Sequence, residues 1–178
     1  MKAMPSRRTF LKTGIAGGVL LAAVAALHEP LDRWTRKELV GRMPRAEARR
    51  VALTAIIPVI LQGALPTDAI ERAAAVSGAI DGVAVAVAAL GASAQEEVAE
   101  LFALLLFAPT RIAVAGVLPA WEEAGEADVT AFLTRWRTSR LGLLQSGYHA
   151  LHDLVLGAWY ADPAHWAAIG YPGPPRVK

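Results

Sequence analysis

Apolar residues recur every three or four positions over most of the chain, and no stretch alternates apolar and polar residues as a half-buried strand does. This spacing predicts an all-α fold, an Ala-rich bundle of about five helices. The expected elements are a basic connector and first helix over 28–50, helices over 46–65 and 68–90, a fourth helix that opens near residue 93, and a long last helix over 126–159.

Residues that favour helix ends mark the boundaries between these elements. Pro58 predicts a kink in the second helix and Pro66 predicts its end, and Thr67 is the expected N-cap of the helix that follows. Gly91 is expected to end that helix. The sequence SAQE, residues 93–96, has the capping-box pattern that opens a helix.

A long apolar stretch lies in the middle of the chain. Its run LFALLLF, residues 101–107, is apolar on all sides and is therefore expected to be buried. The wider stretch 98–121 is apolar enough to suggest a membrane span, but Pro109 and Arg111 divide it into two pieces that are each too short to cross a bilayer. A buried helical hairpin fits the stretch better.

The last predicted helix carries an apolar core stripe and a flank of small residues. Gly142, Ser146 and Ala150 form the flank, where a helix of this chain or of a partner can approach closely. Arg140 falls near the stripe, so we expect it to need a carboxylate or a helix C-terminus as a partner. The stripe consists of Val129, Phe132, Leu133, Trp136, Leu143, Leu144, Leu151, Leu154, Val155 and Ala158.

The front of the chain has the layout of an export signal. A basic segment precedes the uncharged run 13–27, which is short and glycine-rich for a membrane-spanning helix. The basic segment fits the twin-arginine form, which predicts export by the twin-arginine (Tat) translocase to the periplasm or the periplasmic face of the inner membrane. Because the sequence AVA, residues 23–25, is an acceptable cleavage site, residues 1–27 are either a removed signal peptide or a retained anchor in the inner membrane. The motif residues are Ser6, Arg7, Arg8, Phe10, Leu11 and Lys12.

The composition of the 178-residue chain limits the functions that it can have. Residues 28–178 are enough for a single helical domain with a core. They hold 14 basic and 16 acidic residues, and this balance gives no support for nucleic-acid binding. The chain contains no cysteine, which excludes disulfides, iron–sulfur clusters and thiolate zinc sites. Its hydrophobic share of 54% indicates apolar surface available to a membrane or a partner.

Two polar clusters on the last predicted helix are candidates for chemistry. His149 and His152 lie on one side of the helix with Asp153 beside them, but a metal site needs three or four ligands and no motif supplies a third histidine. We therefore favour structural or surface histidines over a metal-dependent enzyme, and expect no catalytic residue, metal or cofactor in the chain itself. The basic cluster RWRTSR, residues 135–140, either forms ion pairs within the fold or binds an anion or a partner.

Aromatic residues and prolines crowd the C-terminal stretch. The pair Asp162 and Pro163 is expected to end the last helix, and 171–175 is too proline-rich for a helix, so residues 160–178 are predicted to form an extended tail. Trp and Tyr are favoured contact residues at protein interfaces. The tail either folds back over its own bundle or docks on another protein. The candidate partner-binding residues are Trp159, Tyr160, Trp166, Tyr171 and Pro172, together with Arg137 and Arg140.

The twin-arginine start, the Ala-rich helical middle and the ending GAWYADPAHWAAIGYPGPP resemble a family of exported proteins called Tat pathway signal proteins, similar to the small subunit (subunit 3) of gluconate 2-dehydrogenase. The resemblance covers most of the chain and is strongest at 6–12 and 157–175. It implies a small subunit without a cofactor that accompanies a large, FAD-dependent dehydrogenase of the glucose–methanol–choline class through the Tat pore. The stretch between Asp162 and Trp166 is shorter than this family leads us to expect, so the resemblance does not extend to gluconate as the substrate.

We therefore expect a non-catalytic accessory subunit that escorts such a dehydrogenase and stays bound to it. The alternative is a stand-alone binding or structural protein of the cell envelope, anchored by its N-terminal segment. In that case the basic stretch 33–50, otherwise a solvated helix face, contacts anionic lipid headgroups. A tail that binds another protein favours the first hypothesis, and a tail packed on its own bundle favours the second.

Overall fold

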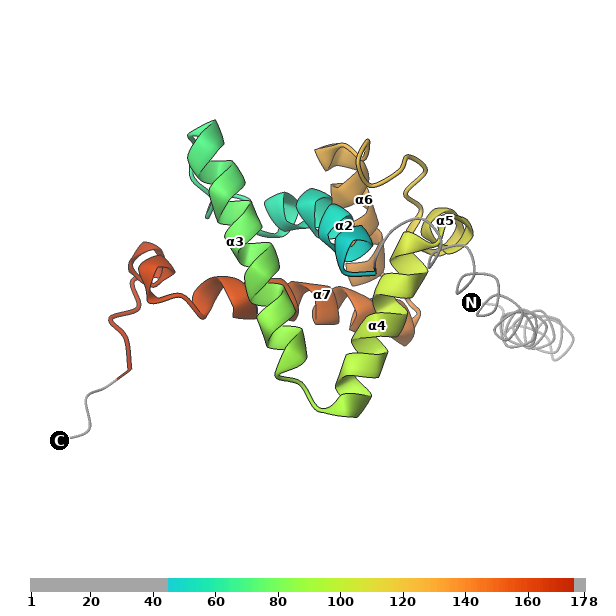
Figure 1. Cartoon of the computed structure of the whole chain (residues 1–178). Helices are drawn as coiled ribbons and strands as arrows, with labels where there is room; N and C mark the ends of the chain where they lie inside the picture. The colour runs from blue at the N-terminus through green and yellow to red at the C-terminus, as the bar shows by residue number, and fades with distance from the viewer. Residues whose placement is uncertain (1–44, 175–178) are drawn as a thin grey trace, which may run out of the picture. The chain divides into compact units, whose positions relative to one another are not determined.

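The computed structural model describes residues 45–174, and every regular element in this range is a helix. The prediction of an all-α fold is therefore confirmed (Figure 1). The Tat motif, the run 13–27 and most of the predicted first helix lie outside the described residues. The elements are α2 (Arg45–Ile60), α3 (Ala69–Ala88), α4 (Ala92–Leu106), α5 (Ala108–Thr110), the π-helical turn η1 (Arg111–Ala115), α6 (Glu126–Arg137), α7 (Gly142–Tyr160) and the 3₁₀ turns η2 (Pro163–His165) and η3 (Ala167–Ile169).

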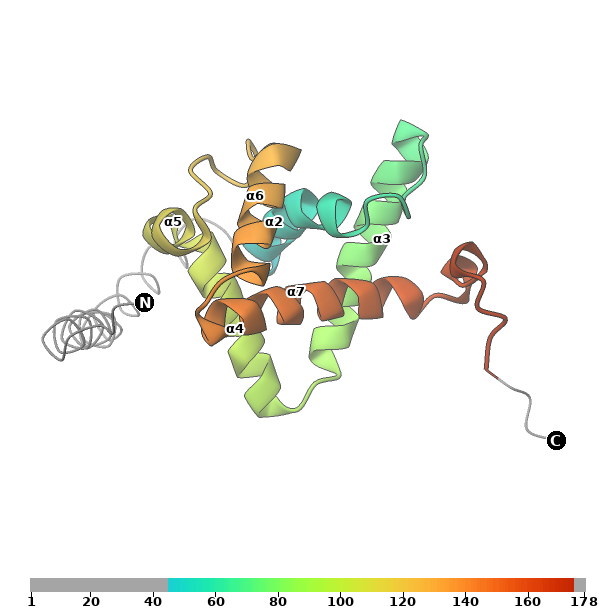
Figure 2. The same cartoon turned by 180° about the vertical axis from the view of Figure 1, so that it is seen from behind.

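Contacts between α3 and α7 and between α6 and α7 organise the bundle (Figure 1, Figure 2). Of the other two long helices, α4 and α2, the second is tied to its neighbours near both ends. Arg50 of α2 pairs with Asp81 of α3 at 2.6 Å, and Gln62, just after α2, donates to Glu126 of α6 at 3.2 Å. Because Ile56 is fully buried, as is its neighbour in sequence, α2 is a core helix rather than a surface element.

The core is built from aliphatic and aromatic side chains of nearly all the helices. The ring of Phe132 packs edge-on against Trp121 and Trp136, with centroids 6.0 and 4.8 Å apart, an arrangement that aromatic pairs prefer. The largest fully buried side chains are Trp136, Phe132, Ile56, Ile57, Leu61, Leu105, Leu151, Val83, Val117, Val129 and Val155.

The second helix ends earlier than predicted. α2 stops at Ile60 instead of continuing to residue 65, and a turn follows in which Gly63 has a φ of 85°. This left-handed conformation is open to glycine at little cost and cannot continue a helix. Pro66, predicted to end the helix, therefore lies in the connection to α3 rather than at the boundary itself.

The caps of the next two helices also differ from those predicted. Asp68, not Thr67, is the N-cap of α3, and its carboxylate accepts hydrogen bonds from two backbone N–H groups at 2.9 Å. α4 already begins at Ala92, so the predicted capping box at 93–96 lies inside the helix. Instead, the side-chain amide of Gln95 donates back to the carbonyl of Leu90 at 2.8 Å, which ties the first turn of α4 to the end of α3.

The long last helix predicted over 126–159 is wrong, because the chain breaks at 138–141 into α6 and α7. The Thr138 hydroxyl donates back to the carbonyl of Thr134 at 2.8 Å, and the Ser139 hydroxyl accepts from the N–H of Leu141 at 3.1 Å. Such short-range bonds compete with helical ones. One consequence is that Leu143, predicted to belong to the core stripe, is 80% exposed.

The predicted flank of small residues shows no close approach of another helix at Gly142. A Cβ added to Gly142 would meet no atom within 4 Å. The close approach occurs instead at Gly147, where a Cβ would lie 2.5 Å from the ring of Trp136, and at Gly82, where it would lie 3.2 Å from the Cβ of Ala158. Only a glycine lets the ring of Trp136 lie directly on the backbone of α7.

The apolar middle of the chain bends sharply after α4. The run 101–107 is buried at Phe102 and Leu105 but exposed at Ala103, so it is not enclosed on all sides as predicted. No single helix of the described residues is long and apolar enough to cross a membrane. α4 and the segment 108–115 are long and apolar enough together, but they are bent by 80° relative to each other.

Side chains from three places hold this bend by capping its carbonyl groups. Trp121 donates to the carbonyl of Leu105 at 2.8 Å, and Trp136 of α6 donates to that of Val114 at 3.1 Å. Arg111 is buried, and its guanidinium donates to the carbonyl of Leu118, two residues after Gly116, at 3.3 Å. Buried polar groups need such partners, and among the described residues no buried side-chain nitrogen or oxygen lacks one.

Candidate partner-binding site

The C-terminal tail is more structured than the sequence predicted. The carboxylate of Asp162 accepts from the N–H of Ala164 at 2.8 Å, and Pro163 supplies the first residue of the 3₁₀ turn η2. The second turn, η3, ends at Gly170 with a φ of 70°. The predicted extended conformation is therefore wrong for 161–170, and residues 171–174 form no regular element.

Two aromatic side chains of the tail cap the end of α7. The last carbonyl groups of a helix have no partner within it. His165 donates from Nδ1 to the carbonyl of Trp159 at 2.6 Å, and the indole N–H of Trp166 donates to the carbonyl of Tyr160 at 2.7 Å. Because a carbonyl oxygen only accepts, Nδ1 is the nitrogen of His165 that carries the proton. The tail is thus hooked onto the end of its own helix.

Ring contacts complete this hook. The imidazole of His165 stacks on the indole of Trp159, with centroids 3.5 Å apart and planes 6° apart. Trp166 meets Tyr171 edge-on at 5.2 Å and accepts at its carbonyl from the N–H of Tyr171 at 3.1 Å. Gly173, with a φ of 94°, lies so close that a Cβ there would be 3.3 Å from the Trp166 ring.

The predicted contact residues of the tail differ in their access to solvent. Trp159 is buried in the core, and Trp166 and Tyr160 are half-buried. Much of the surface of these three side chains therefore contacts this chain and is not available to a partner. Tyr171 is 45% exposed, Pro172 is exposed, and Ile169, which the sequence did not single out, is 56% exposed. We call Ile169, Tyr171 and Pro172 the tail surface.

The tail lies beyond the end of α7 rather than over the faces of the bundle (Figure 1, Figure 2). Its contacts with the helices are made through η2 and the end of α7. Within the described residues the tail therefore packs on the end of its own last helix and leaves the other faces of the bundle uncovered, and its docking on another protein stays a prediction.

The predicted arginines do not join the tail. Arg137 and Arg140 are both exposed and lie at the opposite end of α7, a helix of 19 residues and hence about 28 Å long. The prediction that Arg140 lies near the core stripe is wrong, because the break between α6 and α7 removes it from the helical register. Within the same cluster, Arg135 donates to the carbonyl of Ala115 at 2.7 Å.

The histidine cluster of α7 lies on the surface. His149 is exposed, and His152 contacts the neighbouring Asp153 at 3.3 Å between Nδ1 and Oδ1. Both imidazole rings lie against Tyr148, at 5.3 and 5.5 Å between centroids. Within residues 45–174 no group of three or more His, Asp or Glu side chains is placed to hold a metal ion.

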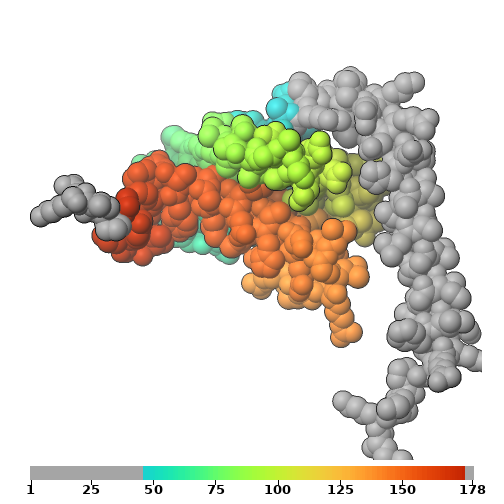
Figure 3. Space-filling model, turned by 90° about the horizontal axis from the view of Figure 1, so that it is seen from below, coloured from blue at the N-terminus to red at the C-terminus, as the bar shows by residue number. Residues whose placement is uncertain are grey.

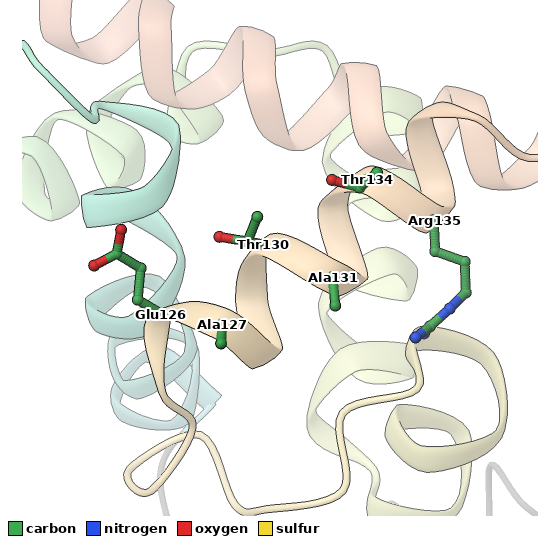
Figure 4. Close-up of a pocket in the computed structure, with 6 residues that line it drawn as sticks. All are labelled: Glu126, Ala127, Thr130, Ala131, Thr134 and Arg135. Carbon is green, nitrogen blue, oxygen red and sulfur yellow. The ribbon is translucent and has the colours of Figure 1, made fainter.

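A shallow hollow of about 750 Å³ follows the outer face of α6 (Figure 4). The residues that line it are Glu126, Ala127, Thr130, Ala131, Thr134 and Arg135. Its two charged ends are already engaged, since Glu126 accepts from Gln62 and Arg135 donates to Ala115. The hollow offers small side chains and two threonine hydroxyls, which do not form a catalytic arrangement.

No protein-family model, curated protein or solved structure shows a detectable similarity to this chain.

His165 and Ile169 are the site residues that sequence reasoning missed. The sequence assigned no role to His165, because its role as a cap depends on the turn at Asp162, which folds the ring back onto Trp159. Ile169 has the exposed apolar character of a contact residue only because η3 turns it outward. A side chain that reaches back six residues to a carbonyl has no sequence pattern comparable to an N-cap.

Proposed function

We propose that this chain is a non-catalytic accessory subunit, exported by the twin-arginine pathway, that binds an FAD-dependent dehydrogenase of the glucose–methanol–choline class and escorts it across the inner membrane. The twin-arginine motif at residues 6–12 and the resemblance of residues 157–175 support this proposal. In this scheme the partner carries the FAD, and the tail surface of this chain is the contact with it.

The observation that carries the proposal is an apolar, aromatic surface held in one shape at the end of α7. The hydrogen bonds from His165 and Trp166 and the close packing of Gly173 fix the course of the tail. Ile169 and Tyr171 nevertheless face outward. A segment that is ordered before it binds loses less conformational entropy on association than a flexible one, so a small surface can still contribute useful affinity.

Copurification from native envelope extract tests the proposal directly. The full-length tagged chain should bring down a flavoprotein that lacks an export signal, and the complex should show the absorption bands of bound flavin. A colourless monomer recovered under gentle extraction would refute the accessory-subunit function and favour a stand-alone envelope protein.

Substitutions in the tail surface test whether it is the contact. Ile169→Ala and Tyr171→Ala should each weaken the complex by about tenfold or more, as expected for truncation of central apolar and aromatic interface residues. Ile70→Ala is the matched control, because Ile70 is 81% exposed on α3, and it should leave the complex unchanged. Equal retention of the flavoprotein by all three variants would place the contact elsewhere.

The export step needs its own test. Replacing Arg7 and Arg8 by lysine should retain both the chain and its flavoprotein partner in the cytoplasm, because the partner depends on this signal. If the partner still reaches the periplasm, it has its own route of export and the escort function is wrong.

A further inference from the structure

The break between α6 and α7 forms an exposed corner where charge and apolar surface coincide. Leu141 and Leu143 are 65% and 80% exposed, and Arg137 and Arg140 beside them are exposed as well. We call these four residues the basic corner. Exposed leucines so close to exposed arginines are typical of surfaces that meet the headgroup region of a membrane, where apolar side chains enter and cationic ones stay at the surface.

The charges of the described residues are sharply segregated around this corner. Between Asp128 and Asp153 the chain contains three arginines and no acidic residue. The rest of residues 45–174 contains five arginines and 13 acidic residues. An anionic surface therefore attracts the corner and repels most of the remainder, which favours one orientation of the bundle.

The position of the corner suits a second contact that leaves the tail free. The corner and the tail surface lie at opposite ends of α7, so a surface bound at one end does not cover the other (Figure 1, Figure 2). Figure 3 shows the same separation, with the start of α7 in orange and the tail in red at the far end of the helix.

The sequence that precedes α2 indicates which anionic surface lies near the bundle. The uncharged run 13–27 is the most membrane-compatible stretch of the first 44 residues, and only 17 residues separate it from Arg45, where α2 begins. Even fully extended, 17 residues reach no further than about 60 Å. On the proposed export route this run reaches the inner membrane, and when it is retained as an anchor it holds the folded bundle within that distance of the bilayer. To this extent the inference rests on the proposed function.

We propose that the basic corner is a membrane-docking surface that binds the anionic headgroups of the bilayer, with Leu141 and Leu143 inserted at the interface. Arg137 and Arg140 provide the electrostatic attraction, and the leucines provide the apolar contact. The inference does not depend on the identity of the partner at the tail, and it is tested without that partner.

The absence of cysteine from the chain allows a direct test with the full-length protein. A single cysteine at Leu143→Cys, labelled with an environment-sensitive fluorophore, reports on the corner. Val85→Cys on α3, also exposed at 71%, is the matched control. On vesicles of phosphatidylglycerol and phosphatidylethanolamine, the label at 143 should shift to shorter wavelength and be quenched by nitroxide-labelled lipid, whereas the label at 85 should not.

The charge contribution is tested in the labelled Leu143→Cys background. Arg137→Gln and Arg140→Gln should each weaken docking about fivefold, and Arg72→Gln, a control on α3, should have no effect. Equal solvent access at 143 and 85 on anionic vesicles would overturn the proposal. Shielding of position 143 that is already present without vesicles would also overturn it, because the corner would then be covered by protein, a second copy or an acidic partner.

Discussion

The contact between Gly147 and Trp136 offers a decisive test of how α6 packs on α7. We consider Gly147→Ala, with Gly78→Ala as the control. Both glycines lie inside long helices, but a Cβ at 78 would meet no atom within 4 Å, whereas a Cβ at 147 would lie 2.5 Å from the Trp136 ring. The two substitutions change the chain identically and differ only in what the new methyl group meets.

Two opposing contributions determine the expected sign. Replacing a glycine in a helix by alanine stabilises the helix by about 0.8–1 kcal/mol, a gain common to both variants. At 147 the new methyl group must displace a fully buried indole that is held by Phe132 and by its bond to Val114. Overpacking of a filled core costs about 1–3 kcal/mol. We therefore expect Gly78→Ala to raise the free energy of unfolding by about 1 kcal/mol and Gly147→Ala to lower it by about 1 kcal/mol.

Urea denaturation followed by far-UV circular dichroism measures both values, and tryptophan fluorescence reports on the ring itself. The difference of about 2 kcal/mol between the variants exceeds the error of extrapolation. If Gly147→Ala is as stabilising as Gly78→Ala, the indole of Trp136 does not lie on the backbone of α7, and the packing of α6 described above is wrong.

Three further substitutions test local features of the fold. Asp68→Ala should lower the free energy of unfolding by about 1 kcal/mol through loss of the α3 cap, and Asp68→Asn should restore most of it. Gly116→Ala should destabilise the protein mainly because the φ of Gly116 is 68°, and the Arg135 guanidinium, 1.8 Å from the added Cβ, would also have to move and give up its bond to Ala115. Arg135→Ala in the same chain should therefore relieve only a small part of the loss, and thermal unfolding would measure both. Arg50→Ala should lower the free energy of unfolding by less than about 1 kcal/mol, and by less still at high salt, because the Arg50–Asp81 pair is exposed. A larger loss in urea titrations would mean that the pair is shielded from solvent.

The helical class of the fold could be predicted because it depends on a repeated signal. Periodicity of apolar residues extends over many turns, and the core positions Val129, Phe132, Leu151 and Val155 were all identified from it. The break at 138–141 could not, since apolar spacing continues through it and the local bonds of Thr138 and Ser139 that accompany the break leave no mark in that spacing. Both Thr67 and Asp68 are good capping residues, so the choice between them depended on backbone geometry.

The candidate site was predicted in composition but not in arrangement. The sequence identified Trp166 and Tyr171 as candidate partner-binding residues, and the structure brings their rings into contact. It also suggested that Arg137 and Arg140 act with them, but these residues lie at the other end of α7. The predicted helix 126–159 already separated both arginines from Trp159 by about 28–33 Å, so grouping them with the tail rested on residue type and not on helix geometry.

The hook at the end of α7 couples the unfolding of the tail to that of the last turn of the helix. Because His165 and Trp166 occupy the carbonyl groups of Trp159 and Tyr160, opening the tail also uncaps the last turn and uncovers one face of Trp159. Hydrogen exchange should therefore report a single opening event for the last turn of α7 and the tail rather than separate fraying of each. A protease that cut between Tyr160 and His165 would therefore also remove the support of a helix that reaches into the core.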